Sequence, residues 1–488
     1  MTKERTARRA VALGGFLAVA LGMRLSSAKE AGKSAADETG KSAAEDGVEV
    51  PPSAVKPDRA EAVPGGVVVP GKLTIVEATK LFRAKGLDLL IADTIVETAH
   101  GALLIARGFT NPAISVGIGG SLTYSPFIAN GSGMGGPGLG GASTFTWNIN
   151  VTDQACIAQI VFGKHGLNVK VARWAYEAAK MDRLDTQRQL EGGMKQQFAQ
   201  TALAKVSIKY ARENRVFSGN IFELVKNKYS AGAVSDADLA AAETDMLETE
   251  QAIAMAESNY YLQKVTLAFL LGSRTIASEY DLDEEFLTNK VSEPLEAPGA
   301  RAQLVRDAFE RRPDLKSIEY YRKSALNALA LARRQRIPDI ALWANYTMEG
   351  TGNSAIQPPT LTAGISTPLP IFYQQQGEIK QAEANLRLQD VTRAKKESQV
   401  ANDLEGSRAG LQFAKDRIDR LEGRLMKRAR DSRDLVKIQY DHGSASLVDL
   451  LFAERQFIQT KQEYLQAQTD YWTAAFQMEQ ALGRELRK

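Results

Sequence analysis

Cysteine and aromatic residues are scarce in this sequence of 488 residues, which contains one cysteine and 7% Phe, Trp and Tyr. A single cysteine excludes an intramolecular disulfide and any zinc or iron–sulfur site built from several thiolates. A surplus of one charge is also lacking, because 61 Lys and Arg oppose 58 Asp and Glu. Nucleic-acid-binding proteins normally carry a strong basic excess, so this near balance argues against that class.

Proline is missing from two long tracts, one between Pro137 and Pro294 and one after Pro370. Turns would interrupt tracts of this length in a compact α/β enzyme. The shortage of aromatics, together with much Ala, Leu, Gln, Glu, Lys and Arg, favours long helices. The apolar content of 44% is that of a folded protein, which excludes extensive disorder. We therefore expect a mainly α protein.

The N-terminus has the layout of a secretory signal peptide, which we predict over residues 1–28. Four cations precede an apolar run from Ala10 to Met23, and small residues for cleavage follow at 26–28. The run is shorter than the roughly 20 residues of a spanning helix, and a buried helix would not begin with clustered cations. No later segment is predicted to be a transmembrane helix. Residues 29–70 are small, charged and rich in proline, so they are predicted to be a disordered low-complexity linker.

The rest of the chain is an internal duplication. Residues 228–272 align without gaps on residues 439–483 at an offset of 211, with 13 of 45 positions identical. A second match relates residues 102–114 to residues 328–340. Chance similarity does not explain two such matches in the same order. We predict a first repeat over 71–272, a connecting segment over 273–300 and a second repeat over 301–488.

Alternation of apolar and polar residues predicts two strands in each repeat, at 114–118 and 145–151 and at 340–346 and 361–365. A soluble sandwich has strands with the same alternation, so each strand alone leaves both architectures open. In an exported chain the four strands resemble the lipid-facing and lumen-facing rows of an outer-membrane barrel. Four strands cannot close a barrel, and open edges are not tolerated in lipid, so several chains would have to share it.

Each repeat also contains one long and two shorter helical segments. The long ones are predicted at Gly163–Tyr229 and Tyr373–Tyr440, and the shorter ones at Ile75–Arg107, Gln303–Arg333, Ser235–Leu271 and Ser446–Leu482. In the last segment large residues recur every seven positions with small residues between them, at Leu450, Phe457, Tyr464, Tyr471 and Met478. Such a seam fits knobs-into-holes packing, either in a hollow helical wall or in a solid coiled-coil bundle.

At this point the chain resembles the TolC-like outer-membrane efflux proteins over about residues 70–488. The resemblance is carried by four motifs in order: Arg312-Pro313-Asp314-Leu315; Ala332-Arg333…Pro338-Asp339-Ile340; Thr367-Pro368-Leu369-Pro370-Ile371-Phe372; and Tyr440…Gly443…Ser446…Asp449-Leu450…Ala453-Glu454…Leu482-Gly483. It implies a trimer with a 12-stranded outer-membrane β-barrel, four strands from each chain, continued by a periplasmic α-helical barrel.

The resemblance also implies a function. Such proteins are passive exit ducts of tripartite efflux pumps or type I secretion systems in Gram-negative-type bacteria, with no catalytic site and no cofactor. Their partners are a periplasmic adaptor and an inner-membrane pump of the RND, ABC or MFS type, together with outer-membrane lipid. The alternative is an exported coiled-coil scaffold or adhesin without transport activity. An enzyme, the third class, finds no nucleophile, base or metal constellation in the sequence.

By motif match, the turns Tyr229–Asp238 and Tyr440–Asp449 would form the periplasmic entrance. Asp238 and Asp449 fall where family members carry constriction carboxylates, and three chains would assemble up to six of them. Both positions are equally explained as residues of the first helical turn, with Ser235 and Ser446 as caps. Two glycines of these turns, Gly232 and Gly443, are expected to have positive φ and to contact the adaptor.

One family feature is missing from the second turn. Where the resting lock of a relative has an Arg and a further Asp, this chain has Ala445 and Phe452. The sequence therefore offers Phe452 as an apolar plug in place of a salt bridge. The three histidines are scattered and predict no metal site. The glycine-rich stretch Gly131–Gly141 lacks the Lys-Ser/Thr of a phosphate loop and is predicted to be an extracellular loop.

Overall fold

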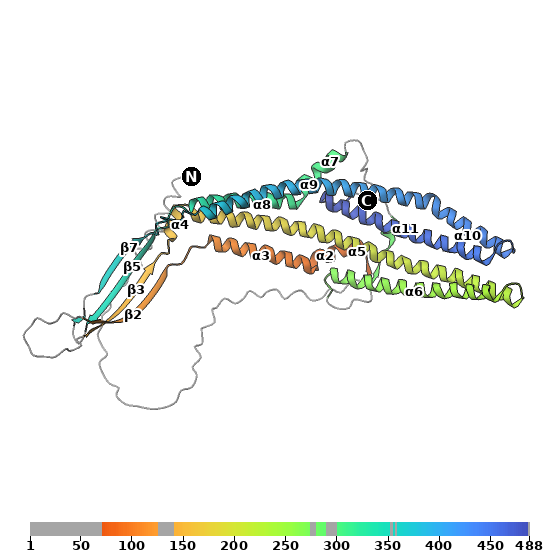
Figure 1. The fold of residues 1–488 in the computed structure, drawn as a ribbon, viewed down its shortest axis with the longest axis horizontal. Helices are drawn as coiled ribbons and strands as arrows, with labels where there is room; N and C mark the ends of the chain where they lie inside the picture. Colours follow the sequence, from red (N-terminus) through yellow and green to blue (C-terminus); the bar gives the residue numbers. More distant parts are fainter. Residues whose placement is uncertain are drawn as a thin grey trace, which may run out of the picture. The chain divides into compact units, whose positions relative to one another are not determined.

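The computed structural model describes residues 71–124, 141–273, 280–288, 300–351, 355–356 and 359–486. The predicted signal peptide at 1–28, the linker at 29–70 and all but the last residue of the loop Gly131–Gly141 lie outside these ranges. The described chain traces the same order of elements twice, as a helical segment, a strand pair, a long helix and a returning helix (Figure 1).

The four predicted strands are present and form one antiparallel sheet. Strands β2 (Ala113–Tyr124) and β3 (Gly141–Thr152) come from the first repeat, and β5 (Ala341–Thr351) and β7 (Thr360–Ser366) come from the second. The order is β2-β3-β5-β7, with the short β6 (Ala355–Ile356) also pairing with β5. The sheet therefore joins the two repeats through the pair β3–β5.

The register of the sheet separates apolar from polar side chains. Residues that pair across antiparallel strands share a face, and the apolar rows are Ile118-Trp147-Met348, Val116-Ile149-Tyr346-Leu361 and Ile114-Val151-Ala344-Ala363. The intervening rows are Ser115-Asn150-Asn345-Thr362 and Gly117-Asn148-Thr347-Thr360. Val116 is 67% exposed and Ile118 74% exposed, so the described residues leave this part of the apolar face uncovered. The predicted division into two faces is confirmed.

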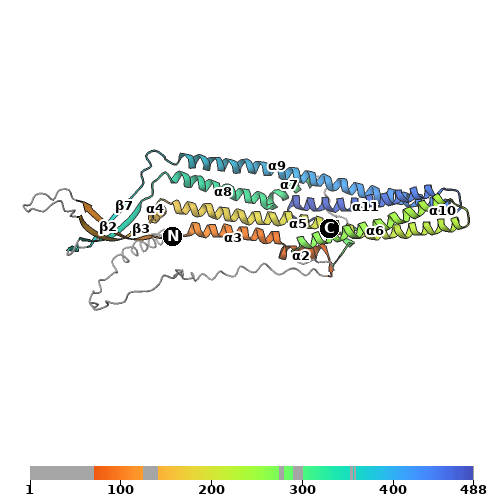
Figure 2. The ribbon, with the colours of Figure 1, turned by 60° about the horizontal axis from the view of Figure 1, so that its bottom comes forward.

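The long helices run side by side from the sheet toward the two turns (Figures 1 and 2). Helix α5 (Lys164–Ser230) contacts α3 (Leu87–Arg107), α6 (Asp236–Leu270), α8 (Pro313–Arg334) and α11 (Leu447–Leu482). In the second repeat, α9 (Gln376–Arg420), the π-helical turn η2 (Leu421–Leu425) and α10 (Met426–Asp441) follow one another without a break. Helices α9 and α10 both pack on α11. The short helix α4 (Cys156–Val161) precedes α5.

Two of the predicted helical segments are wrong in detail, because each is two helices. The first divides at Gly86 into α2 (Ile75–Lys85) and α3, and the second divides before Pro313 into α7 (Ala300–Arg311) and α8. A Cβ at Gly86 would lie 2.7 Å from the Phe82 carbonyl oxygen, which favours glycine at the break. Proline lacks the N–H that would continue the preceding helix and begins a new one well.

The prediction that no segment after the N-terminus could span a membrane is also wrong by length and composition. Residues 75–107 pass that test with a mean hydropathy of 1.6. In the structure, however, this segment is broken at Gly86, and α3 packs along α5. Several of its apolar side chains remain uncovered in a single chain, including Ile91, Ile95 and Ile105. Its apolar character therefore belongs to a helix that packs along α5 and has another side that the described residues leave uncovered.

The seam predicted along the last helix is confirmed. Leu450, Phe457, Tyr471 and Met478 are buried, and so are the small residues Ala453, Ala467, Ala474 and Ala481 between them. The main core lies where α11 passes α5 and α9, next to the parallel pair β1 (Lys72–Leu73) and β4 (Asp281–Leu282) and the 3₁₀ turn η1 (Glu285–Thr288). There Phe286 packs edge-on against Trp472, whose indole N–H donates a hydrogen bond to the Leu287 carbonyl.

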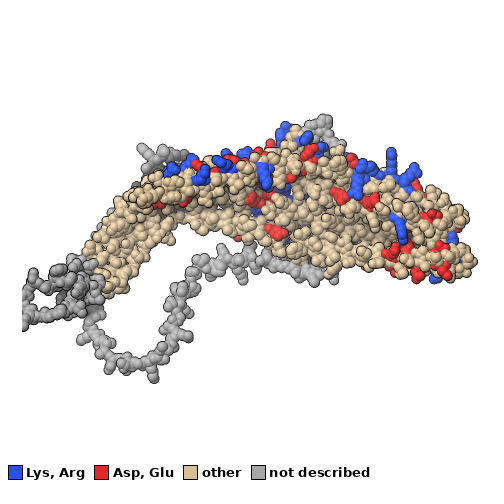
Figure 3. Space-filling model, in the orientation of Figure 1, with Lys and Arg blue, Asp and Glu red and all other residues tan. Residues whose placement is uncertain are grey.

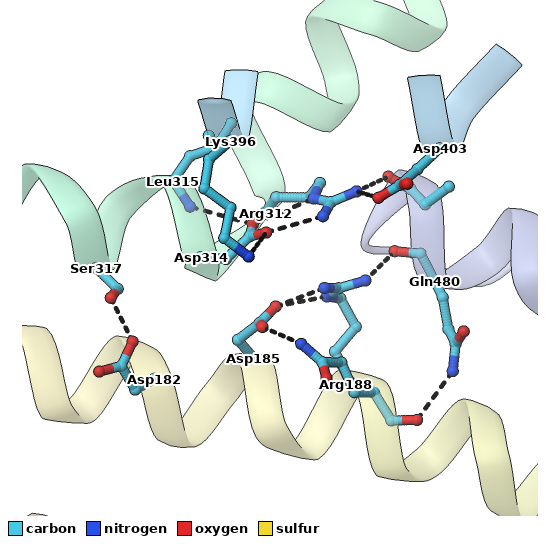
Figure 4. Close-up of polar contacts among 12 residues, drawn as sticks. Asp182, Asp185, Arg188, Arg312, Asp314, Leu315, Ser317, Lys396, Asp403 and Gln480 are labelled. Atoms are coloured by element: carbon cyan, nitrogen blue, oxygen red, sulfur yellow. Dashed lines mark hydrogen bonds and ion pairs between the residues drawn. The ribbon is translucent and has the colours of Figure 1, made fainter. Parts of the chain in front are cut away.

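The end of α11 is bound to the second repeat by the Arg312-Pro313-Asp314 motif and to the first repeat by Arg188 (Figure 4). Arg312 is 3% exposed and forms a bidentate ion pair with Asp314 at 2.8 to 3.1 Å. Arg312 also donates to the Ala481 carbonyl, while Arg188 of α5 pairs with Asp185 and donates to the Gln480 carbonyl. Burial opposes ionisation of Asp314, but the hydrogen bonds and charge of Arg312 outweigh it and hold its pKa below the usual 3.8.

Candidate functional site

The candidate site consists of the two turns that join α5 to α6 and α10 to α11. Helix α5 ends at Ser230, and α6 begins at Asp236 after Gly232, whose φ is +71°. Helix α10 ends at Asp441, and α11 begins at Leu447 after Gly443, whose φ is +76°. A Cβ at either glycine would meet no atom within 4 Å. The positive φ predicted at both turns is confirmed, and backbone conformation rather than space is what favours glycine there.

Both returning helices begin with the same capping box. The Ser235 hydroxyl accepts a hydrogen bond from the Asp238 N–H at 3.2 Å, and the Asp238 carboxylate accepts one from the Ser235 N–H at 3.1 Å. Ser446 and Asp449 repeat this arrangement at 3.2 and 3.0 Å. The interpretation of these four residues as caps is confirmed. The hydrogen bonds from Ser446 hold the pKa of Asp449 below its usual value, so this carboxylate is charged at neutral pH.

The two tyrosines that are equivalent by duplication have different environments. Tyr229 is 40% exposed, and its hydrogen bond to Asp236 raises the pKa of the phenol. Tyr440 is 4% exposed and lies under the ammonium group of Lys228, which is 3.9 Å from the ring centre. Helices α5 and α6 form one helical hairpin, and α10 and α11 form the other. The structure therefore places Tyr440 between these two hairpins and Tyr229 on the outside of one of them.

Phe452 is an exposed apolar side chain close to the second turn. It is 63% exposed, and Val448, one helical turn earlier, is 71% exposed. Ala445 instead packs against the small cluster of Ile221, Val225, Tyr440, Leu447 and Leu450 at this end of the helices. The exposure of Phe452 leaves it available to meet another chain or the centre of a pore. The sequence did not single out Lys228. The equivalent position in the second repeat is Gln439, so no repeated motif marks this lysine.

Charged side chains are distributed unevenly over the described elements. Strands β2, β3 and β7 contain no charged residue, and the visible part of the sheet in Figure 3 shows none. Lys and Arg gather instead over α9 and α10, and Asp and Glu lie near the turn that leads into α6 (Figure 3). Strand β5 carries one charged residue, Glu349. A sheet with so little charge at one end of charged helices separates a lipid-compatible part from a water-compatible part.

A sequence model described as outer membrane efflux protein matches residues 95–273 and 304–484, one stretch in each repeat. The chain belongs to the outer membrane efflux protein family. Among curated relatives it is 22% identical to the cobalt-zinc-cadmium resistance protein CzcC of Cupriavidus metallidurans, over 85% of this chain and 91% of that protein. It is 24% identical to nodulation protein T of Rhizobium leguminosarum, over 53% of this chain and 54% of that protein.

Solved structures of outer-membrane channels share the fold. The structure of CusC, described as a transmembrane channel, aligns with a TM-score of 0.69 at 18% identity, covering 84% of this chain and 92% of that one. The open state of the MtrE outer-membrane channel of Neisseria gonorrhoeae aligns with a TM-score of 0.63 at 17% identity, covering 85% and 89%. The predicted TolC-like resemblance is confirmed.

Membership of the outer membrane efflux protein family decides between the two functions that the sequence left open. The chain is a passive exit duct in the outer membrane, with a large periplasmic helical part. The alternative of an exported scaffold or adhesin without transport is not supported.

Proposed function

We propose that three copies of this chain form one duct, and that the two helical turns of each copy line its periplasmic entrance. The observation that carries the proposal is the open sheet, in which β2 forms one edge and β7 the other. An unpaired strand edge is not tolerated in the hydrocarbon core of a membrane. Edge β2 of one copy pairing with edge β7 of the next would close the sheet, and three copies of four strands make twelve.

The two faces of the sheet support the same arrangement. The exposed apolar rows that contain Val116 and Ile118 would meet lipid, and the rows of Asn, Thr, Ser and Gly would line the water-filled lumen. Closure in the opposite sense would put Trp147 and Tyr346 into water and the asparagines into lipid, at a cost of several kcal/mol for each unsatisfied polar group.

The helices also have sides that a single chain leaves open. Among the described helices, α6 makes extensive contacts only with α5. On α6, Met255, Leu262 and Phe269 are 60 to 66% exposed. On the far side of the hairpin pair, Leu435 and Ile438 of α10 are 60% and 54% exposed. Repetition around a threefold axis would bring these two open sides together and would bury both.

At the entrance we assign the gate to Asp238, Asp449, Tyr229, Tyr440 and Phe452. Three copies of each aspartate would place up to six carboxylates at the entrance, where they would attract cations. We assign the exposed turns with Gly232, Gly443, Ser235 and Ser446 to contact with a periplasmic adaptor, which in turn would join an inner-membrane pump of the RND, ABC or MFS type. In this arrangement the energy comes from the pump, and the duct itself catalyses no reaction and needs no cofactor.

The test combines the mass of the purified protein in detergent with its conductance in a planar bilayer. Wild type is compared with Asp238→Asn/Asp449→Asn, because asparagine keeps the capping bonds and removes only the charge. We expect a trimer, discrete cation-selective steps, and reduced cation preference in the double variant. Glu250→Gln/Glu257→Gln, which removes two carboxylates farther along α6 from the turns, is the matched control. A monomer that does not conduct would refute the duct, and unchanged selectivity would move the gate elsewhere.

A further inference from the structure

Glu454 is the least exposed carboxylate among the residues that the structure describes around the two hairpins. It lies on α11 five residues after Asp449, which is about 7.5 Å along the helix axis. Only 2% of its surface is exposed. Neither of its carboxylate oxygens has a hydrogen-bond partner among the described residues. A buried carboxylate without a partner is costly when it is charged, and much less so when it carries a proton.

The surroundings of Glu454 come from four helices. The charged groups that act on it directly are Asp245 of α6, Arg433 and Asp434 of α10, and Lys461 of α11. Around these lie Glu213 and Ser218 of α5, Glu248 of α6, Arg430 of α10 and Arg455 of α11. Three of the cations are opposite other carboxylates: Arg433 pairs with Asp434 at 2.8 Å, Lys461 with Glu213 at 2.8 Å, and Arg455 with Glu248 at 3.6 Å. None of these cations is hydrogen-bonded to Glu454.

Among the described residues, Arg433 is the cation that lies within 4 Å of a Glu454 oxygen, and it is not hydrogen-bonded to it. The Nε atom of Arg433 is 3.8 Å from the nearer Glu454 oxygen, which is beyond hydrogen-bond distance. Its guanidinium group lies against Phe457 and Phe217, at 4.3 and 4.8 Å from the ring centres, and its Nε and Nη2 atoms both donate to Asp434. On the α6 side, the nearest acid, Asp245, accepts a 2.6 Å hydrogen bond from Ser218.

We propose that Glu454 is a proton-binding site that holds the two helical hairpins of one chain together, and that release of the proton loosens their junction. Its effect on transport rests on the proposed entrance at the turns, whereas binding of the proton does not. Burial, opposed in part by Arg433 and reinforced by Asp245 and Asp434, raises the pKa of Glu454 to about 7. Because the folded-state pKa is raised above the usual 4.5, the junction is tightest at acidic pH and weakens as the pH rises toward about 7.

The duplication supplies a matched control. Glu243 occupies the position of Glu454 in the first repeat, at the offset of 211, and it is exposed on α6. The two residues are chemically identical and follow equivalent capping boxes. They differ because α11 packs extensively on both α5 and α10, whereas α6 packs extensively on α5 alone among the described helices.

The experiment is hydrogen–deuterium exchange of the purified full chain in detergent, from about pH 5.5 to about pH 8.5, a range that brackets the titration. After correction for the chemical exchange rate, we expect protection of peptides over 217–245 and 440–460 to fall at least about tenfold across this range. Glu454→Gln should make protection independent of pH, and Glu243→Gln should behave as wild type. Wild-type protection that does not change with pH, or the same pH dependence in Glu454→Gln, would overturn the proposal.

An infrared titration of the wild type tests the proton directly and does not depend on how the variant folds. We expect a protonated-carboxyl band that disappears near pH 7. The band should be absent in Glu454→Gln and retained in Glu243→Gln. Its absence from the wild type would refute the site. Conductance over the same range separates the two proposals: if exchange titrates through Glu454 while conductance does not, the proton site stands and the entrance assignment fails.

Discussion

The ammonium nitrogen of Lys228 lies 3.9 Å from the centre of the Tyr440 ring and donates a 2.9 Å hydrogen bond to the Tyr440 carbonyl oxygen. Lys228 belongs to the end of α5 and Tyr440 to the end of α10, so one side chain links the two hairpins next to their turns. This contact combines a cation–π interaction with a charge-assisted hydrogen bond, each worth about 1 to 2 kcal/mol.

Lys228→Met should therefore loosen the two turns from each other without unfolding the helices. We expect faster proteolysis at 229–235 and 440–446 and an unchanged helical circular dichroism spectrum. Lys226→Met is the control, because Lys226 is 6.0 Å from the Phe222 ring and its side chain is 59% exposed. Equal proteolysis of both variants would show that Lys228 contributes nothing particular to the junction.

Removing the cap of α11 should fray its first turn. Ser446→Ala and Asp449→Ala each break one half of the capping box and should each cost about 1 kcal/mol. Ser444→Ala is a suitable comparison, because its hydroxyl bonds to the Gln439 carbonyl outside the box. Hydrogen exchange of residues 447–452 measures the effect, and fraying as large in Ser444→Ala as in Ser446→Ala would contradict it.

The buried pair Arg312–Asp314 should make stability depend on acid pH. The pKa of Asp314 is lowered in the folded state, so its contribution is complete above about pH 4 and is lost as the pH falls through the folded-state value. Asp314→Asn should lower stability at neutral pH by about 3 kcal/mol, because the buried Arg312 would then face only the carboxylate of Asp403, at 3.4 Å. Thermal unfolding of both proteins from neutral to acid pH should show a smaller loss for the variant. Parallel curves would refute the assignment to this pair.

The two faces of the sheet can be distinguished at adjacent residues of one central strand. Ile149→Lys places a charge on the apolar face and should cost about 2 to 4 kcal/mol in a bilayer, which should prevent assembly in the outer membrane. Asn150→Lys places the same charge on the polar face and should leave assembly intact while reducing cation conductance. Quantities of trimer in outer-membrane extracts compare the two, and the opposite ranking would invert the assigned faces.

Much of the fold was predictable because its signals are periodic. The alternation in residues 145–151 and the recurrence of large residues every seven positions from Leu450 to Met478 are such signals. Each arises because one face of the element lies in one kind of environment along its whole length. The break at Gly86 was not predictable in this way, since the apolar pattern continues across it and only the close approach of Phe82 favours glycine there.

The candidate site was predictable in its turns but not in its contacts. The spacing of Ser446 and Asp449 predicts a capping box by itself. The different burial of Glu243 and Glu454, or of Tyr229 and Tyr440, was not predictable, because the duplication makes each pair equivalent in sequence. Their difference arises from which neighbouring helices cover α6 and α11, and that information lies in residues far away in the chain.

The pairing of β3 with β5 also determines when the chain can complete its sheet. Trp147 pairs with Met348, so 201 residues (348 − 147) separate the two partners. Ordering a loop of this length precedes any gain from the pairing, and topologies with such distant contacts fold slowly. A chain ending after the first repeat would contain only the two-stranded hairpin of β2 and β3, whose stability is marginal in isolation. Synthesis must therefore reach the second repeat before the membrane part can form, and the exported chain must be kept from aggregating until then.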